Sequence, residues 1–186
     1  MSTVLETERL VLRPIENGDA AAIAAYLNDF DVVKNLAPVP WPYTEEMADE
    51  FIARSRKADE AGELGRFVVL LAGGPLIGWC GATEDEASPG APLGAPELGY
   101  WFGKAHWGQG YATEAARAVV SFAFGDASVR ALTSGYFVDN PASGRVLSKL
   151  GFRRVAQVER PCLSRGCTVT SNRVLLRRDD YEVAAA

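Results

Sequence analysis

Apolar and polar positions along the first third of the chain follow strand and helix periodicities. The apolar run at residues 10–13 is typical of a strand. The alanine-rich segment at residues 19–27 predicts a helix, and a shorter turn or helix is expected over residues 31–36. Three prolines then interrupt regular structure within residues 38–42. The chain therefore begins with a strand and helices, followed by a proline-rich loop.

A second long helix and a hairpin are expected after these prolines. Thr44 is a suitable N-cap, and two glutamates follow it in the first turn, where the helix dipole favours negative charge. The helix should continue to about Ala61, before Gly62. The apolar runs at residues 66–72 and 76–82 are joined by Gly-Gly-Pro, which predicts a β-hairpin.

The middle of the chain alternates between strand and helix patterns. Residues 84–95 are polar and contain prolines and glycine, so we expect a mobile loop. An aromatic strand is expected at residues 97–103, and alanines at helical spacing predict a helix over residues 112–124. Residues 131–138 read as another strand.

The last part of the chain predicts a helix and a closing hairpin. Pro141 suits the first position of a helix, and Gly151 suits the position just after its end. Apolar runs at residues 152–158 and 168–176 form the hairpin. The resulting order, β-α-α-β-β-β-α-β-α-β-β, predicts a mixed sheet with helices on both faces, in one domain over residues 1–186.

Composition restricts the class of protein. The chain has 186 residues, of which 48% are hydrophobic, so we expect a globular domain with a substantial core. No apolar run approaches the ~20 residues of a membrane span, and no signal peptide is visible, so a cytoplasmic location is expected. The net charge is −5 and no basic stripe is present, which argues against nucleic acid as the main partner.

Three cysteines, Cys80, Cys162 and Cys167, are too few for a disulfide framework. Cys162 and Cys167 bracket the expected hairpin tip and could face each other across the strands. The only histidine, His106, lies in another part of the chain, and the cysteine spacing is not that of a zinc site. We expect free thiols, with Cys80 in the core, and no metal.

Residues 106–114 are the most informative stretch, because a loop with two glycines connects the aromatic strand to a helix start. Gly108 and Gly110 allow close approach of a ligand, and the first amides of a helix attract phosphate. The stretch lacks the third glycine of a Rossmann fingerprint and the lysine of a Walker loop, which makes a nucleotide-binding domain a distant alternative. An ordinary strand–helix connection would show the same pattern.

Four sequence blocks, in order, resemble the GNAT acetyltransferase superfamily. Residues 107–112 resemble its acyl-CoA signature, [QR]-x-x-G-x-[GA], with Trp107 where most members have Gln or Arg. The form W-G-x-G-Y-A-T-E-A is similar to the RimJ/RimL branch, which acetylates N-terminal amines. Residues 140–152 resemble the branch's N-x-x-S…L-x-x-x-G-F segment, residues 8–14 its opening, and residues 174–181 its close.

This resemblance implies the GNAT acyl-CoA N-acyltransferase fold, an α/β fold with a central mixed, mostly antiparallel sheet of about seven strands flanked by helices on both faces. It also implies acetyl-CoA as co-substrate, with the strand at Trp101 and Phe102 pairing with the pantetheine arm and a bulge permitted by Gly103. The pyrophosphate would be held at Trp107, Gly108, Gln109, Gly110, Tyr111, Ala112 and Thr113. Glu114 would support the helix start.

Asn140 and Ser143 lie at the start of the helix that is expected from Pro141 onward, within the segment that resembles the family. Asn140 suits an N-cap, and the resemblance implies a further contact with the cofactor arm. Many GNAT enzymes have a tyrosine as general acid where this chain has Leu147, whereas the RimJ/RimL branch has a serine at Ser143. We predict that Ser143 binds the cofactor near sulfur and donates or relays a hydrogen bond to the thiolate, although it could equally satisfy backbone groups. Ser148 is a weaker candidate.

The general base is predicted from position. Glu97 lies on the strand expected to line the cleft, although an exposed strand-end glutamate would look the same. Glu159 or a chain of waters are alternatives, and His106 is expected to be mainly structural. In the proline-rich loop, Trp41 and Tyr43 are predicted to contact the acceptor, or else to pack the loop onto the core.

The function predicted by these residues is N-acetyl transfer by direct attack of an amine in a ternary complex. The acceptor is a protein N-terminal α-amine or a small-molecule amine, and a homodimer is possible because dimers are common in the superfamily. A non-catalytic acyl-CoA sensor or scaffold is the alternative, since Leu147 replaces the tyrosine acid.

Overall fold

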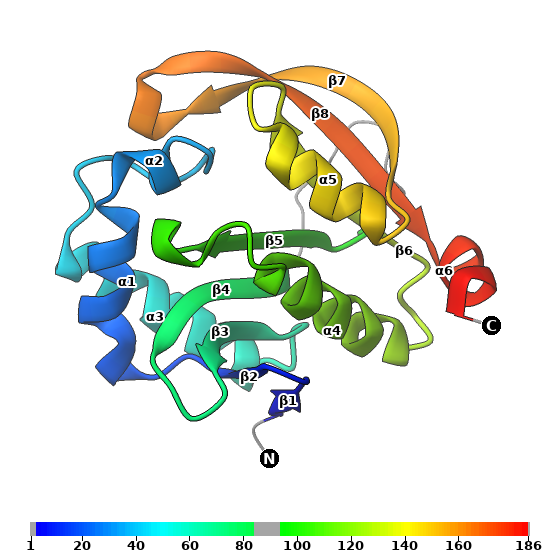
Figure 1. Ribbon diagram of the computed structural model, residues 1–186, viewed down its shortest axis with the longest axis horizontal. Coiled ribbons are helices and arrows are strands. Elements are labelled where there is room, and N and C mark those ends of the chain that lie inside the picture. The colour runs from blue at the N-terminus through cyan, green and yellow to red at the C-terminus, as the bar shows by residue number, and fades with distance from the viewer. Residues whose placement is uncertain (1–2, 84–93, 186) are drawn as a thin grey trace.

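An eight-stranded sheet runs through the centre of the molecule. The computed structural model describes residues 3–83 and 94–185 (Figure 1). The strand order is β1-β2-β3-β4-β5-β6-β8-β7, and every neighbouring pair is antiparallel except β5 and β6. The strands are β1 (Leu5–Glu6), β2 (Leu10–Pro14), β3 (Arg66–Leu71), β4 (Leu76–Thr83), β5 (Glu97–Phe102), β6 (Ala131–Phe137), β7 (Arg153–Cys162) and β8 (Cys167–Arg177).

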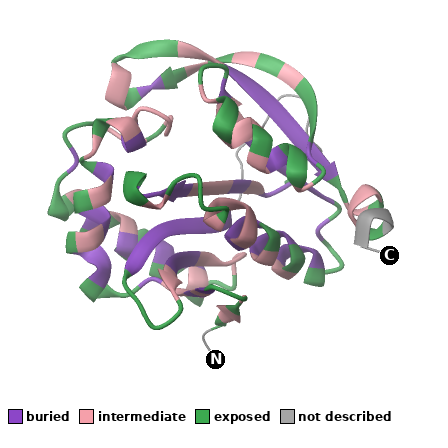
Figure 2. Ribbon diagram, viewed as in Figure 1, coloured by how far each residue is buried: buried purple, intermediate pink, exposed green. Residues whose placement is uncertain are grey.

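Helices cover both faces of this sheet, as predicted. They are α1 (Ala20–Leu27), α2 (Phe30–Val33), α3 (Glu45–Glu60), α4 (Tyr111–Gly125), α5 (Pro141–Lys149) and α6 (Arg178–Ala185), with short 3-10 turns at Asn17–Asp19, Lys104–His106 and Leu163–Arg165. One core cluster joins α1 and α3 to Val68, Trp79 and Trp101, and another joins α4 to Phe67 and Phe102. Neighbouring strand residues thus face opposite layers. Figure 2 shows β4 buried along most of its length between these layers.

Most of the predicted elements are confirmed. Thr44 caps α3 by accepting the Met47 N–H, and Pro141 is the first residue of α5. Gly62 and Gly151 adopt left-handed conformations after their helices, with φ +77° and +91°. The local sequence rules succeed at these positions because the ends of helices depend on neighbouring residues.

Several expectations about the elements need correction. The sheet has eight strands rather than about seven, because the two-residue β1 pairs with β2, and the chain ends in a helix, α6, that was not expected from the sequence. The strands of the closing hairpin extend to Cys162 and start at Cys167, so that the two cysteines are paired in register. The predicted mobile loop at residues 84–95 lies mostly outside the described residues.

The bulge predicted on β5 is wrong. The register between β4 and β5 is continuous from Thr83–Glu97 to Gly78–Phe102, and the irregularity lies between β3 and β4, at Val69 and Leu70. A Cβ at Gly103 would lie 2.2 Å from the ring of Tyr26. Close packing of that ring, rather than a bulge, therefore explains the glycine.

Strands β5 and β6 meet at only one position. Glu97 is the single β5 residue in register with β6, opposite Thr133. The Thr133 N–H donates to Pro96 O at 2.8 Å, and Ser134 Oγ donates to Leu98 O at 2.8 Å. Beyond Leu98 the two strands no longer pair, so the edge of β5 is open in the middle of the sheet.

None of the helices within residues 3–83 and 94–185 is both long and apolar enough to cross a membrane.

Candidate active site

A cavity of about 1020 Å³ occupies the region where β5 and β6 separate. Its walls come from β5, from the loop before α4, from the start of α5 and from α3. It brings together most of the residues that the sequence singled out, which are Tyr43, Glu97, Trp101, Phe102, Trp107, Gly108, Gly110, Tyr111, Ala112, Thr113, Asn140 and Ser143. Gln109 and Trp41 are not part of its lining.

The loop before α4 presents backbone amides to this cavity. Gly108 and Gly110 adopt left-handed conformations, with φ +76° and +85°. Gly110 is the N-cap residue of α4 and provides no side chain to its first amides. The first N–H groups of α4, from Tyr111 onward, therefore receive no hydrogen bond from an N-cap side chain. They can bind an anion, and the helix dipole favours negative charge there.

Arg9 and Glu114 fix this loop from the outside. Glu114 accepts hydrogen bonds from Thr7 Oγ1 at 2.6 Å, Arg9 N at 2.9 Å and Arg9 Nε at 2.7 Å. Burial raises the pKa of Glu114, but these hydrogen bonds from Thr7 and Arg9 outweigh it and lower the pKa overall. Arg9 NH1 also donates to Gln109 O at 3.0 Å. Glu114 therefore joins the first turn of α4 to the segment before β2.

Trp107 ties the same loop to the end of β5. Its indole Nε1 donates to Phe102 O at 2.7 Å, and Gln109 Nε2 donates to Ala105 O at 3.1 Å. The tryptophan ring remains 44% exposed. The side chains of Trp107 and Gln109 thus hold the loop shape.

The open edge of β5 faces the cavity. Backbone groups of alternate strand residues point to the same side. Since Leu98 O faces β6 and accepts from Ser134, the backbone groups of Tyr100 and Phe102 also point toward that side. Phe102 O is occupied by Trp107, so the N–H groups of Tyr100 and Phe102 and the Tyr100 carbonyl are left to pair with an extended ligand.

Asn140 and Ser143 lie at the start of α5, on the opposite wall. Asn140 Oδ1 accepts the Ser143 N–H at 3.3 Å, which confirms the predicted N-cap. Ser143 Oγ lies 2.9 Å from the hydroxyl of Tyr100, and the same tyrosine hydroxyl lies 3.2 Å from Ser143 O. Burial raises the pKa of Tyr100, so its hydroxyl stays protonated. Two hydroxyl groups therefore meet beside the open strand edge.

Glu97 lies on the cavity wall next to two arginines. Its Oε1 accepts from Arg173 NH1 at 2.8 Å and from Arg160 NH1 at 3.3 Å. Glu159 instead accepts from Thr170 at 2.7 Å and is not part of the lining. Of the two carboxylates predicted as general base, only Glu97 borders the cavity.

The two aromatic residues of the proline-rich loop separate. Tyr43 is buried on the cavity wall, and its hydroxyl donates to Met47 O at 3.1 Å. Trp41 is 47% exposed, its ring packs edge-to-face on Phe30, and its Nε1 donates to Asn28 O. The structure therefore brings Tyr43, but not Trp41, to the cavity.

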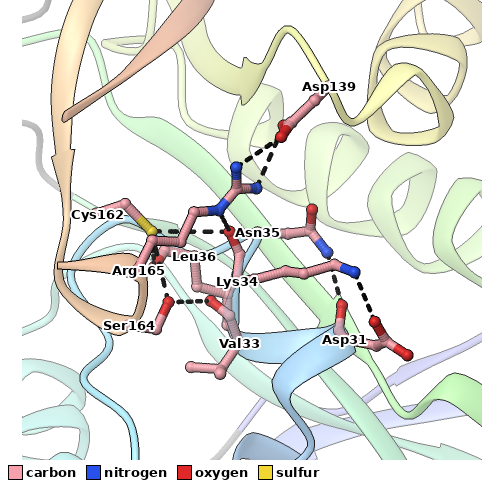
Figure 3. A network of polar contacts seen from close by, with 9 residues as sticks. All are labelled: Asp31, Val33, Lys34, Asn35, Leu36, Asp139, Cys162, Ser164 and Arg165. Carbon is pink, nitrogen blue, oxygen red and sulfur yellow. Dashed lines mark hydrogen bonds and ion pairs between the residues drawn. The ribbon is translucent and has the colours of Figure 1, made fainter. Parts of the chain in front are cut away.

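The tip of the β7–β8 hairpin packs against the end of α2 and the residue that follows it. Arg165 Nε donates to Lys34 O at 2.7 Å and Arg165 NH1 to Asp139 Oδ2 at 2.6 Å (Figure 3). Asp31, next to this network, pairs with both Lys34 and Lys104. Their ammonium groups lower the pKa of Asp31 to about 2, and Lys104 has the larger effect. The network links α2, the hairpin tip and the segment before α5.

This architecture corresponds to a known family. The family model described as an acetyltransferase (GNAT) domain matches residues 9–153, more than half of the chain. The chain belongs to the GNAT acetyltransferase family. It is 28% identical over 151 residues to an uncharacterized N-acetyltransferase, p20, of Bacillus licheniformis, and the match covers 81% of this chain and 82% of the relative.

Solved structures share the GNAT fold. Mycobacterium smegmatis RimJ in complex with CoA-disulfide matches with a TM-score of 0.78 and 19% identity, over 99% of this chain and 93% of that one. Spermidine N-acetyltransferase from Vibrio cholerae, in complex with CoA and spermine, matches with a TM-score of 0.75 and 18% identity, over 95% and 99%. At these identities the likeness is one of fold.

The position of the family's tyrosine acid is apolar in this GNAT domain. Leu147 is 1% exposed and packs in the core between α5, α4 and the sheet, outside the cavity lining. Ser148, the weaker alternative to Ser143, is also outside the lining. Tyr100, to which no role was assigned from the sequence, supplies a phenolic hydroxyl from β5 instead.

Two further residues of the GNAT site were missed by the sequence analysis. Arg173 reaches Glu97 from β8, and Arg9 reaches Glu114 across 105 residues. Alternation along β5 places Tyr100 on the same face as Leu98 and Phe102, which was an available signal for its position. No local pattern identifies the long-range partners of Arg9 and Arg173.

Cysteine and metal chemistry have little support among the described residues. Cys80 is fully buried, and burial raises the pKa of its thiol. None of Cys80, Cys162 and Cys167 lines the cavity, and no cluster of three or more His, Cys, Asp or Glu side chains with metal-ligand geometry occurs in residues 3–83 and 94–185.

Proposed function

We propose that this GNAT protein transfers an acetyl group from acetyl-CoA to a primary amine. The observation that carries the proposal is the single cavity joining the uncapped start of α4, the open edge of β5 and the hydroxyl pair of Tyr100 and Ser143. These features supply an anion site, a backbone template and a hydrogen-bond donor within one continuous space. Acyl transfer from a phosphorylated thioester carrier requires all three.

The start of α4 would hold the pyrophosphate. Gly108 and Gly110 have no Cβ to obstruct the approach, and a Cβ built on Gly108 meets no atom within 4 Å, so the space beside the loop is open. The amides at Tyr111, Ala112 and Thr113 supply the donors. The pantetheine arm would lie along β5 and pair with the backbone of Tyr100 and Phe102 as an added strand.

The reaction would proceed by direct attack of the neutral amine on the thioester carbonyl. A C–N bond forms and the C–S bond breaks, and the developing oxyanion accepts a hydrogen bond from an amide on the open β5 edge. The amine nitrogen loses a proton, and the Ser143 hydroxyl donates a hydrogen bond to the departing thiolate. Asn140 supports this role by fixing the backbone of Ser143.

Glu97 is proposed to receive the amine. It lies on the cavity wall, and its Oε1 is held by Arg173 and Arg160, so its direction is fixed before the acceptor arrives. A fixed carboxylate can orient an amine and take its proton, directly or through a water. Tyr43 would form part of the acceptor wall.

A covalent acetyl-enzyme has less support than direct transfer. Such an intermediate needs an accessible nucleophile, and cysteine attacks as the thiolate. Cys80 is buried, and its raised pKa keeps it a thiol, while Cys162 and Cys167 do not line the cavity. The ternary-complex route requires none of these residues.

The acceptor class is a protein N-terminal α-amine or a small-molecule amine. Within the same fold, the neighbour named a ribosomal L7/L12 alpha-N-protein acetyltransferase illustrates the first class, and the neighbour named spermidine N-acetyltransferase illustrates the second. The activity can be tested by thiol detection of CoA released from acetyl-CoA. The panel would contain peptides with varied N-termini, amino acids, polyamines and aminoglycosides.

We expect acceptor-dependent release with one class of amine, which would name the acceptor. Binding of acetyl-CoA without release on any acceptor would favour a non-catalytic sensor. Failure to bind acetyl-CoA would contradict the proposal.

A further inference from the structure

We propose that Tyr100 is a positioning residue that turns the hydroxyl hydrogen of Ser143 toward the reacting sulfur. This inference rests on the proposed function, and it assigns a role to a β5 residue that otherwise reads as part of the strand's aromatic packing. Leu147 occupies the position at which many GNAT enzymes have a tyrosine acid, so that position of α5 supplies no phenol to the site. The Tyr100 hydroxyl reaches Ser143 from β5 instead.

The geometry around Ser143 leaves two hydrogen-bond arrangements. A serine hydroxyl has one hydrogen to donate and two lone pairs to accept with. Tyr100 Oη lies 2.9 Å from Ser143 Oγ and 3.2 Å from Ser143 O. Either Tyr100 donates to Ser143 Oγ and frees the serine hydrogen, or Ser143 donates to Tyr100, whose own hydrogen then goes to Ser143 O.

An anion beside Ser143 selects the first arrangement. Hydrogen bonds to a charged acceptor are stronger than those to a neutral one, so a thiolate next to Ser143 draws the serine hydrogen toward itself. Ser143 Oγ then becomes a stronger acceptor, and Tyr100 donates to it at 2.9 Å rather than to Ser143 O at 3.2 Å, which completes a chain from Tyr100 through Ser143 to sulfur. Because burial raises the pKa of Tyr100, the phenol keeps its proton and acts through Ser143 rather than as a separate acid.

The surroundings of the pair keep it in place. The Ser143 backbone is held by Asn140, and a Cβ at Gly144 would lie 2.7 Å from the Tyr136 ring, so the start of α5 is packed closely against β6. Tyr100 is fixed by the β4–β5 ladder, opposite Cys80. A hydrogen bond between two such fixed elements orients the hydroxyl group before the substrate binds.

A double-mutant cycle tests whether Tyr100 acts through Ser143. We expect Tyr100→Phe to lower kcat roughly 5- to 20-fold with less than about a twofold change in the KM for acetyl-CoA. In the Ser143→Ala background, Tyr100→Phe should change kcat less than about twofold, because the hydroxyl it orients is gone. Tyr181→Phe is the control: it removes a phenol hydroxyl from a ring that packs on Phe124 and does not line the cavity, and it should leave kcat within about twofold.

Equal losses from Tyr100→Phe in the wild-type and Ser143→Ala backgrounds would overturn the proposal, since the two residues would then act independently. A loss explained by a lower folded fraction at the assay temperature would overturn it as well. Thermal unfolding of each variant separates this outcome from a loss of positioning.

A binding measurement tests the same contact without turnover. The probes are CoA and desulfo-CoA, which lacks the thiol, each titrated at about pH 7 and about pH 9, on either side of the ~8.5 of an ordinary thiol. In wild-type protein the preference for CoA should grow at the higher pH, because the thiolate accepts the serine hydrogen. Tyr100→Phe and Ser143→Ala should reduce that growth to a similar extent.

If the preference for CoA over desulfo-CoA still increases with pH in Tyr100→Phe but not in Ser143→Ala, the role of Tyr100 alone is overturned. If this increase is unchanged in both variants, the contact with sulfur is overturned. No binding of either probe to the wild-type protein would instead contradict the proposed function itself.

Discussion

Arg9 and Glu114 lie 105 residues apart in sequence and form a two-point contact, with Arg9 N at 2.9 Å from Oε1 and Arg9 Nε at 2.7 Å from Oε2 of the carboxylate. Arg9 comes from the segment before β2, and Glu114 from the first turn of α4. The same guanidinium also holds Gln109 O in the glycine loop. An edge of the sheet thus fixes the loop that we propose binds the pyrophosphate.

Arg9→Ala should therefore weaken binding of acetyl-CoA more than it slows the chemical step. We expect the KM for acetyl-CoA to rise by roughly 5- to 30-fold, with kcat nearly unchanged. Steady-state kinetics checks this. Arg153→Ala, in an exposed pair 3.8 Å from Asp180, is the control and should leave both constants unchanged. A fall in kcat alone would contradict the assignment of Arg9 to binding.

Gly110→Ala should damage the anion site beyond its effect on stability. An L-residue at φ +85° is strained by about 1–2 kcal/mol, and its Cβ would lie 3.4 Å from Arg9 NH2, against the guanidinium that holds the glycine loop. Gly73→Ala imposes similar strain at φ +68° in a turn far from the cavity. Both variants should unfold at a lower temperature, but only Gly110→Ala should lose affinity for CoA by calorimetry. If Gly110→Ala binds CoA as tightly as Gly73→Ala does, this loop does not bind the cofactor.

Glu97→Gln should slow transfer, because a neutral amide cannot take a proton from the acceptor. We expect kcat to fall by about 10²-fold or more if Glu97 is the base. Glu159→Gln removes a carboxylate outside the cavity and should leave kcat unchanged. If Glu97→Gln keeps wild-type kcat across the pH range, Glu97 serves only to orient the acceptor or has no part in the reaction.

Asp31 should make an acid-sensitive contribution to stability. Its pKa is lowered to about 2 by Lys104 and Lys34, so the folded state favours the carboxylate. For a lowered pKa, the stabilisation is present above the unfolded value near 4 and is lost as the pH falls toward 2. Asp31→Asn should lower the unfolding temperature at neutral pH, and the difference should shrink between about pH 5 and pH 2. If the difference in unfolding temperature grows on acidification, the predicted stabilisation by the Asp31 carboxylate is contradicted.

The parts of the fold that follow from local rules were predictable from the sequence. The Thr44 cap, Pro141 at the start of α5 and the left-handed Gly151 after its end depend on neighbouring residues or on the absence of a side chain. The strand–loop–helix pattern also located the glycine loop. The two-residue β1 was missed because so short a segment carries no periodicity of its own.

Contacts between distant segments were not predictable in the same way. No role was assigned to Tyr100 from the sequence, since an aromatic strand residue has the same pattern whether or not its hydroxyl finds a partner. Its contact with Ser143 depends on where α5 lies relative to β5, which the sequence does not encode locally. Gly103 was misread for a similar reason: the ring that requires it belongs to Tyr26, in α1.

The most direct test follows the acetyl group itself. The protein would be mixed with one equivalent of acetyl-CoA and the amine found by the panel, and both the protein and the acceptor would be analysed by mass spectrometry through a single turnover. Direct transfer predicts one acetyl group on the acceptor nitrogen and none on the protein at any time. An acetyl group on the protein that is later passed to the acceptor, or an acceptor left unmodified while acetyl-CoA stays bound, would contradict the account.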